Sequence, residues 1–531
     1  MTIAVATNGR TKTAVSSCLQ DLLNDSVASR IAAKDFTLWG KEAEAESSIR
    51  LGWVTSALDS NHLVSAILDL KTYFNDRGID RFVLCGMGGS SLAPEVIAKT
   101  ASVLLVVLDS TNPEQVSKAL DGDLTKTAVI VSSKSGSTVE TDSQKRLFEA
   151  AFTNAGIDKT DRIVIVTDPG SPMEIAAKAD GYRVFNADPT VGGRYSALTA
   201  FGLVPSGLAG ADIARLLSDA KEVMSLLASN EDTNPALILG AALARTAYAE
   251  KFADKIVIVE DGTEIQGFGD WAEQLIAEST GKLGKGILPV VVSKSANELS
   301  SPAGDTVIVR VVANATSAGV NEIAVSGSLG GQFLLWEYAT VIASRLIGVN
   351  PFDQPDVESA KIAARGMLEG RVAESEADFV AQDIEVRALG FDLKDSKTVP
   401  EAIAALLKTL ADDGYLSVHA YLDREGFPEA NEIRDAIARR TNRPTTFGWA
   451  PRFLHSTGQY HKGGPAQGVY LQLISRAEAD LSVPGRDFTL GELIGSQASG
   501  DAKVLADHGR PVLTLTLNDV AAGLKTISES I

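Results

Sequence analysis

Apolar runs followed by polar turns and helical patterns recur through the first part of the chain. The run at residues 129–131 leads into a polar turn, and residues 140–152 have the pattern of a helix. Residues 81–100 and 161–179 repeat the order of strand, turn and helix. Continuous Val, Ile and Leu runs are typical of strands that are covered on both faces. We therefore predict a parallel sheet between layers of helices, an α/β fold.

The same pattern returns later in the chain. Residues 254–261 and 306–312 are apolar runs, and residues 268–282 and 330–348 are helical in pattern. Residues 410–531 again mix strand-like and helical segments. We expect four parts, which are a helical N-terminal segment, two α/β domains and a C-terminal α/β region: 1–50, 51–205, 206–370 and 371–531.

Composition narrows the class of protein. The 531 residues carry a net charge of −19, which argues against nucleic acid bound on a broad basic surface, so the positive charge for any phosphate must be local. Two distant cysteines, Cys18 and Cys85, and five histidines without ligand spacing predict no metal site and fit a reducing compartment. With no signal-peptide pattern and no apolar run of membrane length, we expect a cytoplasmic protein that does not bind membranes.

The polar turn at residues 133–138, called the phosphate turn below, has the residues of an anion site. Backbone N–H groups and the positive end of a helix dipole meet where a strand turns into a helix. Hydroxyl groups and one ammonium group add to them: Ser133, Lys134, Ser135, Ser137 and Thr138. The alternative is a helix cap in which Ser137 and Glu140 form a capping box, and both interpretations can hold together.

A second turn, residues 86–91, is called the glycine turn. Gly89 and Ser90 stand where a backbone can approach a ligand closely. The turn lacks the dinucleotide-binding pattern of glycines and the acidic residue that follows it, so we predict no nucleotide cofactor. Both turns follow parallel strands, at whose carboxyl ends ligands bind, which favours a sugar-phosphate pocket. The alternative is two tight turns that need glycine and nothing more.

Charged and amide side chains near these turns are candidates for catalysis. Arg194 follows two glycines and could neutralise an oxyanion, or it could form a surface salt bridge. Gln274 and Glu278 share one helix face with Trp271, and burial would raise the pKa of the Glu278 carboxyl and suit it to general-base catalysis. The alternative is a solvated glutamate.

Two further candidates lie nearer the C-terminus. Gln354 and Lys361 are two helical turns apart and so face the same way, although local sequence alone favours a surface lysine at Lys361. His455 lies in a polar, glycine-rich segment, with His461 close behind it. His455 could act as an acid or base, or it could be an ordinary solvated residue.

Five motifs together resemble the phosphoglucose isomerase (glucose-6-phosphate isomerase) family. They run in the family's order through about residues 80–365: GMGGSS, SSKSGSTVET, GGRYSALTAFGLVP, QLIAESTGKLGKGILP and NPFDQPDVESAK. Residues 1–50 and the tail are most similar to the isomerase half of bacterial transaldolase–glucose-6-phosphate isomerase fusions. The resemblance implies two sugar-isomerase (SIS) domains with flavodoxin-like parallel sheets. It also implies the interconversion of glucose 6-phosphate and fructose 6-phosphate through a cis-enediol, without a metal or organic cofactor.

The resemblance also implies roles for individual residues. Glu278 would move the proton between C2 and C1, Arg194 would stabilise the enediolate, and Lys361 would assist ring opening. Gln274 and Gln354 would bind the sugar. The substrate phosphate would be held by residues of the two turns: Ser90, Ser133, Lys134, Ser135 and Thr138.

One feature departs from the family pattern. Many members carry a ring-opening histidine between the base and the lysine, often within HSxGQ, but residues 279–360 contain no histidine. HSTGQ stands at residues 455–459 instead, so we predict that His455 is the displaced equivalent. The family's histidine comes from the partner subunit, so a homodimer is one possibility and a same-chain histidine is the other. Two alternatives remain for the function, a non-catalytic sugar-phosphate sensor and an isomerase that also accepts mannose 6-phosphate.

Overall fold

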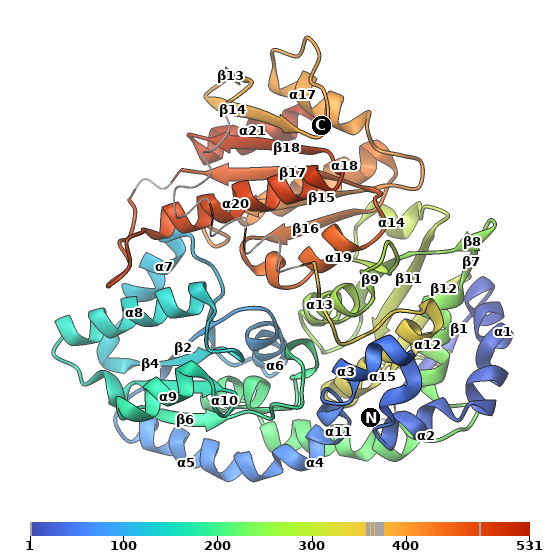
Figure 1. The fold of residues 1–531 in the computed structure, drawn as a ribbon, viewed down its shortest axis with the longest axis horizontal. Coiled ribbons are helices and arrows are strands. Elements are labelled where there is room, and N and C mark those ends of the chain that lie inside the picture. Colours follow the sequence, from blue (N-terminus) through green and yellow to red (C-terminus); the bar gives the residue numbers. More distant parts are fainter. Residues whose placement is uncertain (1–2, 357–361, 363–365, 367–375, 477–478) are drawn as a thin grey trace.

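The part of the chain that the structure describes forms three large sheets, with helices packed around them, and a small two-stranded sheet of β7 (Ala247–Tyr248) and β8 (Lys251–Phe252) (Figure 1). The computed structural model describes residues 3–531 apart from 357–361, 363–365, 367–375 and 477–478. Most strand pairs in the three sheets are parallel, which confirms the predicted α/β class, including the α/β C-terminal region.

The first sheet is entirely parallel in the order β3-β2-β4-β5-β6. Its strands are β2 (Arg81–Gly86), β3 (Val106–Leu108), β4 (Thr127–Ser132), β5 (Ile163–Thr167) and β6 (Arg183–Asn186). Every residue of the central strand β4 is buried, as its continuous apolar run predicts. The helices of this part are α5 (Leu63–Asn75), α6 (Leu92–Thr100), α7 (Pro113–Leu120), α8 (Val139–Asn154), α9 (Pro172–Ala179) and α10 (Ala200–Ala209).

The second sheet has the order β1-β12-β11-β9-β10. Its strands are β1 (Ala4–Thr7), β9 (Lys255–Asp261), β10 (Leu288–Val291), β11 (Thr306–Val312) and β12 (Glu322–Ser326). The helices of this part are α11 (Ile213–Leu227), α12 (Pro235–Arg245), α13 (Phe268–Thr280), α14 (Asn297–Ser300) and α15 (Leu329–Ile347). Helix α15 is buried from Leu329 to Ser344 and contacts α11, α12 and α13, so it is the central helix of this part.

The N-terminal segment differs from the prediction at its start. The sequence predicts a helical segment over residues 1–50, and α1 (Arg10–Asn24) and α2 (Val27–Ala32) are helices. However, β1 pairs antiparallel with β12 at the edge of the second sheet. All four residues of β1 are half-buried, and so short a segment has no periodicity that separates a strand from a helix.

The C-terminal region forms a third, mixed sheet in the order β13-β14-β18-β17-β15-β16. Its strands are β13 (Phe379–Ala381), β14 (Ile384–Leu389), β15 (Tyr415–Tyr421), β16 (Thr445–Trp449), β17 (Gly468–Ser475) and β18 (Val512–Leu517). Its helices are α17 (Val399–Leu407), α18 (Glu432–Thr441), α19 (Gly458–Gly463), α20 (Leu490–Asp507) and α21 (Val520–Ser530). This region lies across the other two sheets, at the top of Figure 1.

The first two sheets share one hydrophobic core, whereas the third sheet has a core of its own. One continuous core includes Phe82 of the first sheet, Val309 of the second and the central Trp336 of α15, whereas most of the third sheet packs around a core of its own. The described strands lie in the parts of the chain for which the sequence predicts α/β structure, apart from β1, which lies in the segment predicted to be helical. The domain limits at residues 51, 206 and 371 remain predictions.

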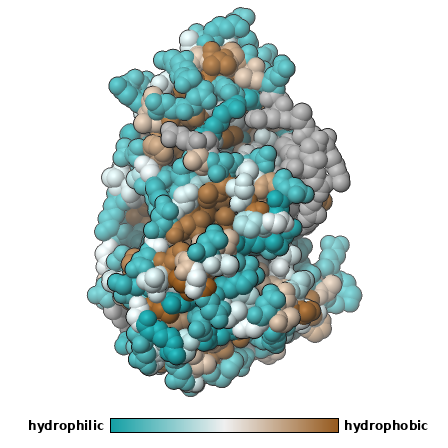
Figure 2. All heavy atoms as spheres, turned by 90° about the vertical axis from the view of Figure 1, so that its left-hand side faces the viewer, coloured by the Kyte–Doolittle hydropathy of each residue, from teal (hydrophilic) through white to brown (hydrophobic). Residues whose placement is uncertain are grey.

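The outer surface is mostly hydrophilic on the side of the first sheet, with hydrophobic side chains gathered across the middle of that face (Figure 2). Among the described residues, we find no helix with the length and apolar character needed to span a bilayer.

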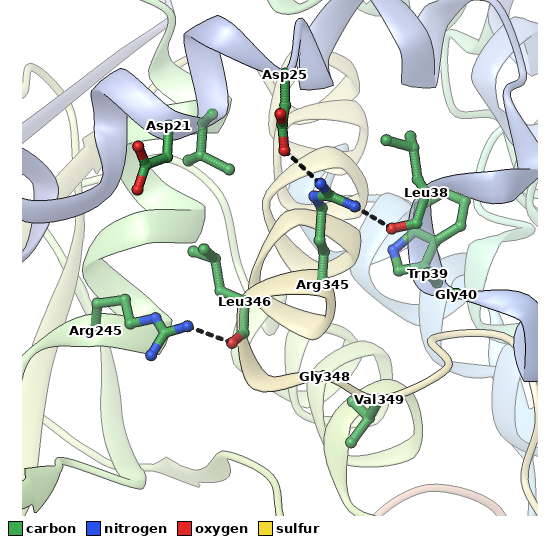
Figure 3. A pocket seen from close by; sticks show the side chains of 11 residues that line it. Asp21, Asp25, Leu38, Trp39, Gly40, Arg245, Arg345, Leu346, Gly348 and Val349 are labelled. Atoms are coloured by element: carbon green, nitrogen blue, oxygen red, sulfur yellow. Dashed lines mark hydrogen bonds and ion pairs between the residues drawn. The ribbon is translucent and has the colours of Figure 1, made fainter.

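A hollow of about 380 Å³ lies where α1 meets the end of α15 (Figure 3). Arg345 donates hydrogen bonds to Asp25, at 2.6 Å, and to the Leu38 carbonyl. Arg245 donates to the Leu346 carbonyl at 2.6 Å. These contacts fix the C-terminal end of α15, from which the chain continues into residues 348–355.

Candidate active site

A pocket of about 640 Å³ lies at the carboxyl ends of the first sheet's strands, beneath the C-terminal region. Eleven of the twelve predicted site residues line it: Gly89, Ser90, Ser133, Lys134, Ser135, Thr138, Arg194, Gln274, Glu278, Gln354 and His455. The twelfth, Lys361, lies outside the described residues. The structure thus brings together side chains from distant parts of the chain, from Gly89 to His455.

The phosphate turn connects β4 to α8. The Ser133 and Thr138 hydroxyls are 3.1 Å apart, and the Gly136 N–H donates to Ser133 Oγ at 3.2 Å. Thr138 is the N-cap of α8, yet no side chain caps the helix, so the expected capping box of Ser137 and Glu140 is wrong. The first N–H groups of α8 are therefore available to an anion in addition to the hydroxyl groups.

Lys134 is tied to a carboxylate at the edge of this turn. Its Nζ is 2.5 Å from Asp168 Oδ2. Burial lowers the pKa of Lys134, although Asp168 opposes the shift. Arg50 and Glu46 also line the pocket, and Arg50 Nε contacts Glu46 at 3.2 Å. Sequence reasoning missed both residues, because they belong to the N-terminal segment and carry no motif.

The glycine turn packs against the segments that carry the catalytic candidates. A Cβ atom on Gly89 would lie 2.0 Å from the Gly193 carbonyl oxygen, next to Arg194. Gly88 has a φ of +56°, in the left-handed region, and a Cβ there would lie 2.7 Å from the His455 carbonyl oxygen. Only glycine allows these close approaches, so the turn has a packing role as well as access to a ligand.

Arg194 is buried and fully engaged, so a surface salt bridge is the wrong interpretation. Its Nη1 donates to Gln354 Oε1 at 2.8 Å and lies 3.4 Å from Glu278 Oε2. Its Nε donates to Ser279 Oγ at 2.9 Å, and its Nη2 donates to the Pro351 carbonyl at 2.7 Å. The guanidinium is therefore fixed between the base candidate and the segment that carries Gln354.

Glu278 is 5% exposed, which excludes the solvated alternative. It lies one turn after Gln274 on α13, as the helix pattern predicted. Burial raises the pKa of the Glu278 carboxyl, while Arg194 and His455 oppose the shift. Gln274 Nε2 donates to the His455 carbonyl at 2.8 Å, and its buried Oε1 has no partner among the described residues. That oxygen is available to a ligand hydroxyl.

His455 of the same chain reaches the pocket and pairs with a carboxylate. Its Nε2 lies 2.9 Å from Glu140 Oε1, which also accepts a hydrogen bond from Gln497 at 2.7 Å. Burial would raise the pKa of Glu140, but the contacts with His455 and Gln497 hold it below its usual value. His461 is buried elsewhere, with Nδ1 3.0 Å from the Tyr415 hydroxyl.

Glu140 is the main candidate residue that sequence reasoning missed, because the sequence suggests only a capping role for it. Its place in the first turn of α8, next to the phosphate turn, was the available signal. Lys282 was missed as well. Its Nζ donates to the carbonyls of Asn350, at 2.8 Å, and Asp353, at 2.6 Å, and burial lowers its pKa to about 8. Lys282 thereby supports the segment that leads to Gln354.

The described residues include no group of three or more His, Cys, Asp or Glu side chains that could hold a metal ion. The chemistry of the pocket is that of a proton-transfer site. One cavity is lined by a buried carboxylate beside a guanidinium, by the phosphate turn and by a histidine that pairs with the carboxylate of Glu140.

Comparison with solved structures confirms the fold class. A hypothetical protein (TT0462) from Thermus thermophilus aligns with a TM-score of 0.58 and 24% identity, over 69% of this chain and 100% of that chain. A glucose-6-phosphate isomerase from Chlamydia trachomatis aligns with a TM-score of 0.51 and 19% identity, over 62% and 75%. At these identities the likeness concerns the fold alone.

Sequence comparison identifies the family. The model of the family described as phosphoglucose isomerase matches residues 71–318. A probable glucose-6-phosphate isomerase of Haloarcula marismortui is 36% identical over 39% of this chain, and the match spans 48% of that protein. One of Natronomonas pharaonis is 29% identical over 65% of this chain and 92% of that protein. These matches place residues 71–318 of this chain, slightly less than half of its length, in the phosphoglucose isomerase family.

Proposed function

We propose that this protein is an aldose–ketose isomerase that interconverts glucose 6-phosphate and fructose 6-phosphate. The observation that carries the proposal is the buried Glu278, which faces the same cavity as the phosphate turn and lies beside Arg194. The relatives named above are isomerases of this kind by name. A cytoplasmic location remains part of the proposal, since Cys18 and Cys85 are both unpaired.

In this proposal the phosphate turn holds the substrate phosphate. The hydroxyls of Ser133, Ser135 and Thr138, with Ser90 from the glycine turn, donate to the phosphate oxygens together with the first N–H groups of α8. Lys134 contributes its charge and turns from Asp168 toward the phosphate. Binding at this end orients the sugar toward Glu278, which lines the same pocket.

Ring opening is assigned to His455. Its pairing with Glu140 orients the imidazole, so that His455 can give a proton to the ring oxygen. Lys361 would assist from the segment outside the described residues and remains a prediction.

Isomerisation itself is assigned to Glu278. The carboxylate removes the proton from C2 and returns it to C1, and its raised pKa makes it a stronger base than an exposed glutamate. Arg194 offsets the negative charge that develops on the enediolate oxygen. Gln274 and Gln354 hold the sugar hydroxyls, which keeps C1 and C2 within reach of the base.

The alternatives make different use of the same pocket. A sugar-phosphate sensor would need the phosphate turn but not a buried base beside an arginine, so Glu278 favours the enzyme. The tolerance for mannose 6-phosphate depends on contacts at C2, for which no observation favours either outcome. A homodimer remains a prediction, although His455 enters the pocket of its own chain.

A coupled assay tests the proposal. Conversion of fructose 6-phosphate is followed through NADP reduction by a glucose-6-phosphate dehydrogenase. We expect turnover that persists after exhaustive chelation of metals. Binding of a sugar phosphate without turnover would support the sensor and contradict the proposed enzyme.

A further inference from the structure

A buried arginine anchors residues 450–459, called the histidine segment below. Arg452 lies three residues before His455, and its side chain is 10% exposed. It contacts carboxylates from three separate elements. Nε donates to Asp109 Oδ2 at 2.5 Å, Nη1 lies 3.5 Å from Asp270 Oδ2, and Nη2 pairs with Glu95. The histidine segment is thereby joined to α6, to the end of β3 and to α13.

These contacts connect the histidine segment to the elements that build the pocket. Glu95 is in the first turn of α6, the helix that follows the glycine turn. Asp270 precedes Gln274 and Glu278 on α13 at intervals of four residues, so the three lie along one side of that helix. Arg452 thus contacts the same helix that carries the base.

The charges of this cluster favour a permanently ionised anchor. Burial alone would raise the pKa of Glu95, but Arg452, Arg424 and Lys99 hold it well below its usual range. Burial alone would also lower the pKa of Arg452, but Asp109 and its neighbouring carboxylates raise it. A planar guanidinium can engage several carboxylates at once, which a lysine ammonium does less well.

We propose that Arg452 is a positioning residue for His455, a role that rests on the proposed function. By fixing the histidine segment, Arg452 places His455 Nε2 at 2.9 Å from Glu140 Oε1. It also places the His455 carbonyl oxygen at 2.8 Å from Gln274 Nε2. The plain structural alternative is that Arg452 only docks the C-terminal region onto the first sheet. In that case its loss would affect activity independently of His455.

A double-mutant cycle separates these roles. Arg452→Gln is made in the wild-type protein and in His455→Ala, and kcat and KM for fructose 6-phosphate are measured. We expect Arg452→Gln to lower kcat by about tenfold or more when His455 is present, and by less than about threefold when it is absent. KM should change little, because the phosphate turn is untouched.

Arg443→Gln is the matched control. Arg443 Nη2 lies 2.5 Å from Asp305, so it also makes a buried ion pair between the C-terminal region and another part of the chain, but it does not line the pocket. We expect it to lower the melting temperature without a comparable loss of kcat. If Arg452→Gln does not fold, Arg452→Lys is taken through the same cycle, with a smaller loss that again depends on His455.

Equal losses with and without His455, or an equal loss in Arg443→Gln, would overturn the positioning role. If the wild-type protein does not isomerise the substrate, the proposed function fails and the role of Arg452 falls with it. If the wild-type protein is active and Arg452→Gln lowers kcat by the same factor with and without His455, only the role of Arg452 is overturned.

Discussion

At the scale of single residues, the site depends on charged groups that are buried next to one another. Glu278, the proposed base, lies beside Arg194, and His455, the proposed acid for ring opening, is paired with Glu140. Removing one member of such a pair leaves the other charge buried and unpaired. Each substitution is therefore best compared with a control that removes a similar ion pair outside the pocket.

Lys134→Ala should raise KM for the phosphorylated sugar more than it lowers kcat. The phosphate is bound in the ground state and in the transition state alike, so losing this contact weakens both equally. Steady-state kinetics provide the measurement. Lys145→Ala is the control, because Lys145 pairs with Glu149 on α8 away from the pocket. An unchanged KM in Lys134→Ala would remove Lys134 from the substrate site.

At the scale of elements, helix α8 serves the site twice through its first turn. Its uncapped N–H groups face the phosphate turn, and its Glu140 orients a histidine from the C-terminal region. Glu140→Gln should lower kcat by about tenfold or more, because the neutral amide no longer gives His455 a charged acceptor that holds the imidazole in orientation. Glu149→Gln on the same helix is the control for helix stability. Equal activity in the two variants would contradict the role of Glu140.

The sequence predicted the elements better than the contacts between them. The apolar runs predicted the buried strands, and the polar turns after them predicted residues that line the pocket, since both depend on neighbours in the chain. The half-buried strand β1 was missed because its partner β12 lies far away in the chain, with Ala4 opposite Ser326. Glu140, Arg50 and Lys282 were missed for a similar reason, because their partners are set by the packing of separate elements.

At the scale of the whole molecule, the C-terminal region completes the pocket of its own chain. It supplies His455 from above the first two sheets, so each chain carries one full set of the described site residues. Mixing the impaired Glu278→Gln and His455→Ala proteins, with unfolding and refolding to exchange any subunits, should therefore restore no activity beyond that of the two proteins measured separately. Recovery toward a quarter of the wild-type rate, as in sites shared between subunits that mix at random, would contradict a same-chain histidine.

The most direct test of the central claim, that Glu278 moves the proton between C2 and C1, is isomerisation in deuterium oxide by wild-type protein and Glu278→Gln. The wild-type protein should form product with solvent deuterium at the exchanged carbon, detected by NMR. Glu278→Gln should lose both turnover and exchange by at least about 100-fold while it still binds a sugar-phosphate analogue. A Glu278→Gln protein that keeps more than about a tenth of the wild-type kcat would show that Glu278 is not the base.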